Sequence, residues 1–352
     1  MKHIKLLFAL AAAALLFTNC NNDGGFEDSP YDLTSGGVII LDEGMLGVGN
    51  AEISYYTPGD GQVINNVFEK ANDADFGDAA ASLTFYGGRM YATLSASDKI
   101  YVIDPKTSLM TGKLTDINSP RDMYFFSSTK AYVSSLYANE IYIVNPSTMT
   151  VTGTVVLGAG NSAETLISHG GYIYTNCWNN NSRLLLKIDP AKDQVVATLE
   201  VGYQPSKMTI DKNGSLWVFT DGGWTSDWTT HLETPALHRV GTIDFTVENS
   251  WPMGDWDWVT AAAMNAAGDK LYYVNTDVYE IPVSGSYADA RAVIPADGRS
   301  FYGLGVLPNN DLYVSDPLDY QQAGDVFRYN SSFGLVASFK VGVAPAKFYT
   351  YR

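Results

Sequence analysis

The tryptophans are the residues of this sequence whose placement best indicates chemistry. The 352-residue chain has seven tryptophans, and two short segments, 221–228 and 251–258, hold five of them among Asp, Gly, Ser and Thr. Indole rings that lie outside a core can cover a partner with a large flat surface, and their N–H groups can donate hydrogen bonds to it. These segments indicate recognition of a large, partly apolar ligand.

Groups for acid–base, nucleophilic or metal catalysis are few. Of four histidines, His3 falls in the N-terminal leader, and only His169 and His231 fall on or near predicted loops. The sequence has no Gly-x-Ser-x-Gly elbow and no phosphate-binding loop. Two cysteines, Cys20 and Cys177, exclude a disulfide scaffold and a cysteine-based metal centre. We therefore expect no enzyme, no catalytic cofactor and no metal site.

Charge and composition exclude further classes of protein. Lys and Arg number 22 and Asp and Glu 38, so the net charge is 22 − 38 = −16, which makes nucleic acid a poor partner. Because 46% of the residues are hydrophobic and only 17% are charged, the chain is expected to fold around a core.

Residues 1–20 are predicted to be a signal peptide. Lys2 and Lys5 precede an apolar run from Leu6 to Phe17, which is too short to span a bilayer, and Cys20 follows. A signal that ends at Cys resembles a bacterial lipoprotein signal, which implies lipidation of Cys20. An ordinary secretory signal, cut somewhat later, is the alternative. Residues 21–34 are polar and acidic and predict a flexible tether.

A repeat runs through the rest of the chain, residues 35–352. Seven copies of one apolar–aromatic strand recur at intervals of 41 to 55 residues: Val38–Leu41, Met90–Thr93, Ala131–Ser134, Tyr172–Thr175, Leu216–Phe219, Leu271–Val274 and Leu312–Ser315. Each unit has room for about four short strands and shows no convincing helix, which predicts an all-β, seven-bladed β-propeller. The C-terminal segment 343–352 resembles the opening strand of a blade and is expected to complete blade 1, which lacks one.

The loops between second and third strands, together with the links between blades, should form one face of such a ring. Ligand-binding residues are expected there because rigid blades hold these loops in place. The candidates are Trp178, Asn180, Trp224, Trp228, Trp256, Trp258, Arg121, Asn139, Tyr137, Arg299, Tyr302 and Tyr320. For segment 255–258 the alternative is packing between blades, and for the two arginines it is pairing with nearby acidic side chains.

Three features recur together: Tyr-Val-Ser/Thr strands, the strand Ile100-Tyr-Val-Ile-Asp-Pro105 and the Val-Gly-x-x-Pro link. The combination resembles the YncE/surface-layer class of seven-bladed propellers. With a lipoprotein signal and an acidic chain of this length, it resembles the BtuG-like, surface-exposed vitamin B12-binding lipoproteins of Bacteroidetes. The resemblance implies a lipid anchor in the outer membrane, exposure at the cell surface, capture of cobalamin or a related corrinoid as a bound ligand, and delivery to a TonB-dependent outer-membrane transporter.

Two other functions stay open from the residues alone. Aromatic loops stack on sugars as well, so a surface glycan-binding or adhesion propeller is the first alternative. A metal-dependent, lactonase-like propeller enzyme is the second, although the few histidines disfavour it.

Overall fold

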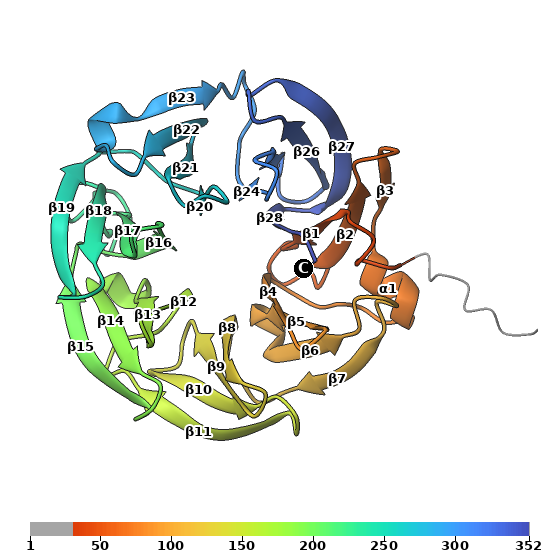
Figure 1. Cartoon of the computed structure of the whole chain (residues 1–352), viewed down its shortest axis with the longest axis horizontal. Coiled ribbons are helices and arrows are strands. Elements are labelled where there is room, and N and C mark those ends of the chain that lie inside the picture. The colour runs from red at the N-terminus through yellow and green to blue at the C-terminus, as the bar shows by residue number, and fades with distance from the viewer. Residues whose placement is uncertain (1–30, 352) are drawn as a thin grey trace, which may run out of the picture.

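A computed structural model of the chain describes residues 31–351. Over that range the chain forms seven four-stranded antiparallel sheets, which stand as blades around a central axis (Figure 1). This is the seven-bladed β-propeller that the repeat predicts, so that prediction is confirmed.

In each blade the strands follow one another from the axis outward. Blade 1 contains β28 (Pro345–Tyr349), β1 (Val38–Asp42), β2 (Glu52–Thr57) and β3 (Gln62–Ile64). Blade 2 contains β4 (Ala80–Tyr86), β5 (Arg89–Leu94), β6 (Lys99–Ile103) and β7 (Met110–Leu114). Blade 3 contains β8 (Pro120–Ser127), β9 (Lys130–Ser135), β10 (Glu140–Asn145) and β11 (Thr150–Val156). Blade 4 contains β12 (Leu166–His169), β13 (Tyr172–Asn176), β14 (Leu184–Asp189) and β15 (Gln194–Glu200).

The remaining blades have the same order. Blade 5 contains β16 (Pro205–Ile210), β17 (Ser215–Thr220), β18 (Ala236–Gly241) and β19 (Thr246–Pro252). Blade 6 contains β20 (Ala261–Met264), β21 (Lys270–Asn275), β22 (Asp277–Pro282) and β23 (Arg291–Ile294). Blade 7 contains β24 (Leu304–Val306), β25 (Leu312–Asp316), β26 (Ala323–Tyr329) and β27 (Leu335–Val343).

Blades are held together by apolar side chains that fill the space between neighbouring sheets. The described core falls into seven clusters, and each draws its residues from two adjacent blades. The recurring apolar–aromatic segment forms the second strand of every blade and is buried on both faces, which is why it reads as a continuous apolar run. Outer strands such as β15 alternate between partly covered and exposed residues, because only one of their faces meets a neighbour.

The C-terminal strand closes the ring. Strand β28 pairs antiparallel with β1, with Tyr349 opposite Ile39 and Phe348 opposite Ile40 (Figure 1). Phe348 is buried in the cluster between blades 7 and 1. The expectation that segment 343–352 completes blade 1 is therefore confirmed.

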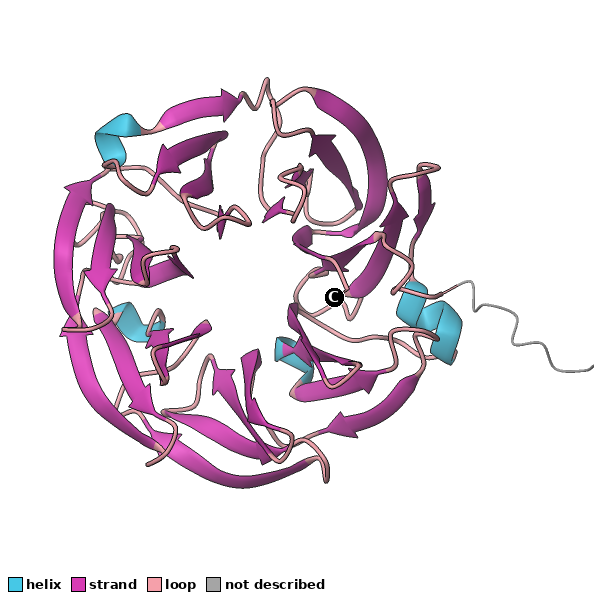
Figure 2. Cartoon of the chain, in the orientation of Figure 1, coloured by secondary structure: helices cyan, strands magenta, loops and turns pink. Residues whose placement is uncertain are grey.

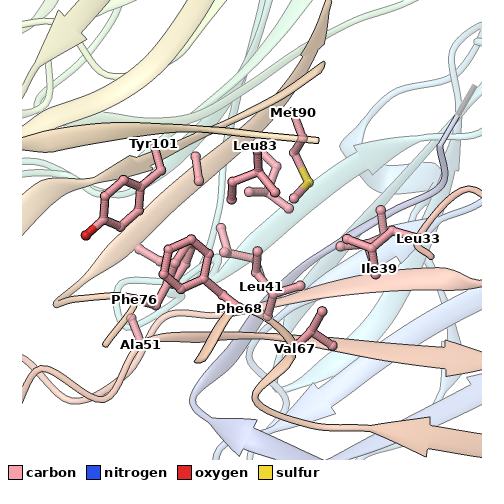
Figure 3. Packing of buried hydrophobic residues seen from close by; sticks show 14 of the residues in the cluster. Leu33, Ile39, Leu41, Ala51, Val67, Phe68, Phe76, Leu83, Met90 and Tyr101 are labelled. Atoms are coloured by element: carbon pink, nitrogen blue, oxygen red, sulfur yellow. The ribbon is translucent and has the colours of Figure 1, made fainter. Parts of the chain in front are cut away.

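Helical turns are short and lie in loops (Figure 2). The α-helix α1 (Val67–Asn72) sits between blades 1 and 2, and η1 (Ser95–Ser97), η2 (Asn179–Asn181) and η3 (Tyr287–Asp289) are single 3-10 turns. Helix α1 adds Phe68 to the core cluster shown in Figure 3, where its ring stacks on Tyr101 with centroids 4.9 Å apart. The repeat did not predict this helix.

The packed part of the chain begins before residue 35. Leu33 is buried, its N–H donates to Pro105 O (2.8 Å), and Ser108 Oγ donates to Tyr31 O (2.6 Å). Residues 31–34, which the sequence assigns to the tether, thus lie against blade 2, because Leu33 fills the first interblade core (Figure 3). The signal peptide and Cys20 lie outside the described residues. Within residues 31–351, no helix is long and apolar enough to cross a membrane.

Candidate functional site: an aromatic loop face over a charged channel

One end of the ring gathers the loops that the sequence singles out. Because the strands of a blade alternate in direction, the loops between second and third strands and the links between blades emerge at the same end of the ring. We call this end the loop face. Its longest loop, residues 221–235, connects β17 to β18 in blade 5 and is called the tryptophan loop.

The tryptophan loop is held by its own backbone as an extended hairpin. Glu233 N donates to Gly222 O (3.0 Å), and Leu232 N donates to Gly223 O (3.2 Å). Gly222 has φ +81°, and a Cβ there would lie 2.2 Å from Glu233 O. Only glycine fits this turn without displacing the opposite strand of the hairpin.

Side chains from blade 4 and from the first strand of blade 5 anchor the base of the loop. Asp221 accepts hydrogen bonds from Trp178 Nε1 (2.9 Å) and Ser206 Oγ (2.6 Å). The Asn181 amide donates to Trp224 O (2.9 Å) and accepts from Trp224 N (3.2 Å). Trp178, predicted as a ligand contact, is half-buried, and its indole N–H holds Asp221 at the base of the loop.

A second anchor fixes the returning limb of the loop. Arg183 forms an ion pair with Glu233 (3.0 Å) and stacks over the Tyr203 ring at 4.3 Å. The other Glu233 oxygen accepts the N–H of Tyr203 (2.7 Å). A long loop fastened at so many points presents its side chains in fixed positions, which lowers the entropy that a ligand must overcome on binding.

The tryptophan loop and the link between blades 5 and 6 bring four rings together. We call them the tryptophan cluster: Trp224, Trp228, His231 and Trp256. The Trp224 ring lies 3.9 Å from His231 and 6.4 Å from both Trp228 and Trp256, centroid to centroid. Trp256 comes from the link between blades 5 and 6, so two predicted segments converge. Trp228 is 69% and Trp256 74% exposed, an unusual state for the largest apolar side chain. The sequence marks His231 only as a possible base.

Other predicted residues occupy the loop face without joining the cluster. Trp258, Tyr137 and Tyr320 are exposed on separate loops. Asn139 and Asn180 are also exposed, and Asn180 Nδ2 donates to Gly160 O (3.4 Å). The structure places them on the same end of the ring and shows no direct contact between them and the tryptophan cluster among the described residues.

Neither of the two predicted arginines joins the tryptophan cluster. Arg299 lies over the Phe327 ring at 4.6 Å and donates to Ala296 O (3.3 Å), which packs it against blade 7. Arg121 turns toward the axis and pairs with Glu164, with Nε 2.8 Å from Oε2. Pairing with an acidic neighbour, the alternative reading of the sequence, therefore describes Arg121 in this structure.

A cavity of about 360 Å³ occupies the central channel below the loop face. It is lined by residues at or just before the start of the inner strands, among them Arg121, Glu164, Lys207, Tyr302 and Lys347. Ser206 also lines it and holds Asp221, so the cavity wall and the tryptophan loop share one hydrogen bond.

Tyr302 and Tyr320, both predicted, meet at the rim of this cavity with ring centroids 5.4 Å apart. The Tyr302 hydroxyl donates to Glu43 Oε2 (2.5 Å), and its burial, reinforced by that carboxylate, raises the pKa of Tyr302 well above its usual value. Burial by itself would lower the pKa of Arg121, but the adjacent Glu164 raises it, so Arg121 stays charged.

His238 and Cys177 are both buried and lie outside the lining of this cavity. His238 is buried between Thr220 Oγ1 (3.2 Å) and Ser250 Oγ (3.0 Å), and burial lowers its pKa to about 4. Burial raises the pKa of the Cys177 thiol to about 12. Residues 31–351 contain no group of three His, Cys, Asp or Glu side chains placed to hold a metal ion.

Four other charged residues of the channel were not predicted from the sequence, namely Glu43, Glu164, Lys207 and Lys347. A signal for two of them exists: Pro205-Ser206-Lys207 and Pro345-Ala346-Lys347 repeat a Pro-x-Lys pattern after the Val-Gly link. The pattern opens an inner strand in both blades, and both strands bulge at its middle residue.

The fold and its loop face define the chain as a seven-bladed β-propeller with a preformed aromatic surface. Residues 36–331 match the family described as "Domain of unknown function (DUF5074)", and the chain belongs to that family. No curated protein sequence shows significant similarity to it.

Solved structures confirm the architecture. A quinonprotein alcohol dehydrogenase-like protein from Bacteroides thetaiotaomicron superposes with a TM-score of 0.67 at 13% identity, covering 91% of this chain and 79% of that one. Hydrazine synthase from Kuenenia stuttgartiensis gives 0.61 at 14% identity, covering 74% and 86%. Virginiamycin B lyase from Staphylococcus aureus gives 0.57 at 13% identity, covering 74% and 83%. At these identities the likeness concerns the fold alone.

Proposed function

We propose that the loop face captures a large, flat, partly apolar organic ligand without changing it chemically, and that this ligand is cobalamin or a related corrinoid. The observation that carries the proposal is the tryptophan cluster, in which two highly exposed indoles are held in place by a loop anchored at its base. Exposed aromatic rings that gather in one patch usually mark a binding surface.

Cobalamin suits the chemistry of this surface. Its corrin ring offers an apolar plane for stacking, and the amide groups around its edge need hydrogen-bond donors and acceptors. Next to the cluster, the hydroxyl groups of Thr225 and Thr229 both donate to Asp227, which leaves their oxygens as acceptors. Asn139 and Asn180 supply exposed amides elsewhere on the loop face. A ligand that retains its own axial groups requires no protein side chain on cobalt.

The proposal extends to location and partner through the N-terminal sequence. A signal peptide over residues 1–20 with lipidation at Cys20 would anchor the propeller to the outer membrane, with the loop face free at the cell surface. Two or more acyl chains anchor a protein stably. A captured corrinoid would then pass to a TonB-dependent outer-membrane transporter.

Isothermal titration of the chain from Asn21 onward with cyanocobalamin tests the function. We expect saturable 1:1 binding and a red colour that stays with the protein on desalting. No heat and no retained colour would contradict cobalamin as the ligand. In that case a glycan array tests the sugar-binding alternative, and ester turnover that a chelator abolishes would indicate the lactonase-like one.

A further inference from the structure

Two lysines in the channel cavity have no partner in the described part of the chain. Lys207 and Lys347 line the cavity from blades 5 and 1, and the ammonium group of neither forms a hydrogen bond or ion pair with another residue in the range 31–351. Most other described lysines near acidic side chains do pair, as Lys130 does with Asp193 (2.7 Å). Lys207 and Lys347 are the two lysines among the residues that line this cavity.

The acidic groups around the cavity are already engaged. Glu164 Oε2 is bound to Arg121, and Glu43 Oε2 accepts from Tyr302. Asp122 lies near Lys347, but its two oxygens accept the backbone N–H groups of Met123 and Leu166, both at 2.9 Å. Among the described residues, none of these carboxylates forms an ion pair with Lys207 or Lys347, and Asp122 and Glu43 act on Lys347 only through space.

The electrostatics agree with this geometry. Lys347 is open to the channel but surrounded by protein, and this desolvation lowers the pKa of Lys347. The charges of Asp122 and Glu43 oppose the shift, and those of Arg121 and Lys207 reinforce it, so the two ammonium groups repel one another. An anion between them would relieve that repulsion.

Two further atoms of the cavity wall are buried without a hydrogen-bond partner in the described chain: Thr260 Oγ1 and Glu164 Oε1. Thr260 can donate to an anion. Glu164 Oε1 can only accept, so it requires a donor on the ligand, and leaving it empty costs free energy.

We infer that the channel cavity binds hydrogenphosphate through Lys207, Lys347 and Thr260, with Glu164 Oε1 accepting a hydrogen bond from the hydroxyl group of the ligand. Two ammonium groups without an ion-pair partner can each donate to the anion, and the lone acceptor selects for an anion that keeps a hydrogen, which sulfate does not. The site is separate from the tryptophan cluster and does not depend on the ligand proposed for it.

Titration calorimetry of the chain from Asn21 onward with inorganic phosphate, near neutral pH in a phosphate-free buffer, tests this inference. We expect saturable binding that weakens about tenfold or more in Lys207→Gln and in Lys347→Gln, since each removes a charge-assisted hydrogen bond. Lys113→Gln is the matched control: Lys113 is exposed on the outer strand β7, and its variant should bind as the wild type does.

Two more titrations sharpen the result. Sulfate should bind at least tenfold more weakly than phosphate, and methyl phosphate, whose dianion also lacks a hydrogen for Glu164 Oε1, should bind more weakly as well. Lys347 lies in the closing strand β28, so its variant could lose stability, and a melting curve must show that it is folded. Lys207 lies outside that strand, so its variant tests phosphate binding without this complication. Absence of phosphate binding, or binding unchanged in both variants, would overturn the inference. Sulfate binding as tight as phosphate binding would overturn the assignment to Glu164.

Discussion

Replacing Trp228 by alanine separates ligand binding from stability. A tryptophan side chain presents up to about 250 Å², and Trp228 is 69% exposed, which leaves roughly 170 Å² for a ligand to cover. At about 25 cal/mol per Å², full coverage would contribute about 4 kcal/mol. A flat ligand covers one face of the ring, so we expect a loss of about 2 kcal/mol, or roughly 30-fold in Kd.

The same substitution should leave the fold intact, because an exposed side chain contributes little to the core. Calorimetric titration with cyanocobalamin gives the affinity, and a thermal melt gives the stability. Phe126→Ala is the matched control, since Phe126 is 48% exposed near the end of strand β8, at the end of the ring opposite the loop face. Wild-type affinity in both Trp228→Ala and Trp256→Ala, with both variants folded, would refute the assignment of the cluster as the binding site.

Three further predictions concern stability. Deletion of residues 343–352 removes β28 and should leave blade 1 with an open edge, so circular dichroism should show loss of the cooperative melt; a truncated chain that melts like the full one contradicts closure by β28. Gly222→Ala should lower the free energy of unfolding by at least about 2 kcal/mol. Gly170 has φ +58° but open space around its Cβ, so Gly170→Ala should lower the free energy of unfolding by less in the same denaturant titration. Equal losses in the two variants would contradict the close approach of Gly222 to Glu233. Because His238 has a pKa of about 4 in the fold against its usual 6.5, its stabilising effect is complete above pH 6.5 and declines as the pH falls toward 4, by about 3 kcal/mol in all. The difference in unfolding free energy between wild type and His238→Gln, followed from pH 7 to pH 4, should shrink accordingly, and a constant difference would refute the buried neutral imidazole.

The sequence predicts the architecture well because each blade carries the same local pattern. The second strands are buried on both faces, so they read as apolar runs bounded by turns, and seven of them require seven sheets. The closing strand could be predicted because residues 343–352 repeat the Pro-x-Lys opening of blade 5. Helix α1 could not, because six residues carry no clear period and the helix depends on a distant group: Glu52 accepts the N–H groups of Phe68 (3.1 Å) and Glu69 (3.4 Å).

The sequence predicts which residues lie on the loop face but not which of them contact one another there. Trp224, Trp228 and Trp256 meet, as the aromatic segments indicate, whereas Trp178 and Arg121 turn to Asp221 and Glu164, respectively. Those orientations depend on contacts across more than 40 residues. The channel lysines were missed for the same reason, since only the closed ring brings blades 1 and 5 to a common axis.

The most direct test of the central proposal is equilibrium dialysis of cyanocobalamin against the wild-type chain and against a Trp228→Ala/Trp256→Ala double variant of equal thermal stability. We expect the wild type to retain one ligand per chain and the double variant to lose most of that retention. Retention of no ligand by the wild type, or the same amount by both proteins, would contradict the proposal that the tryptophan cluster captures the corrinoid.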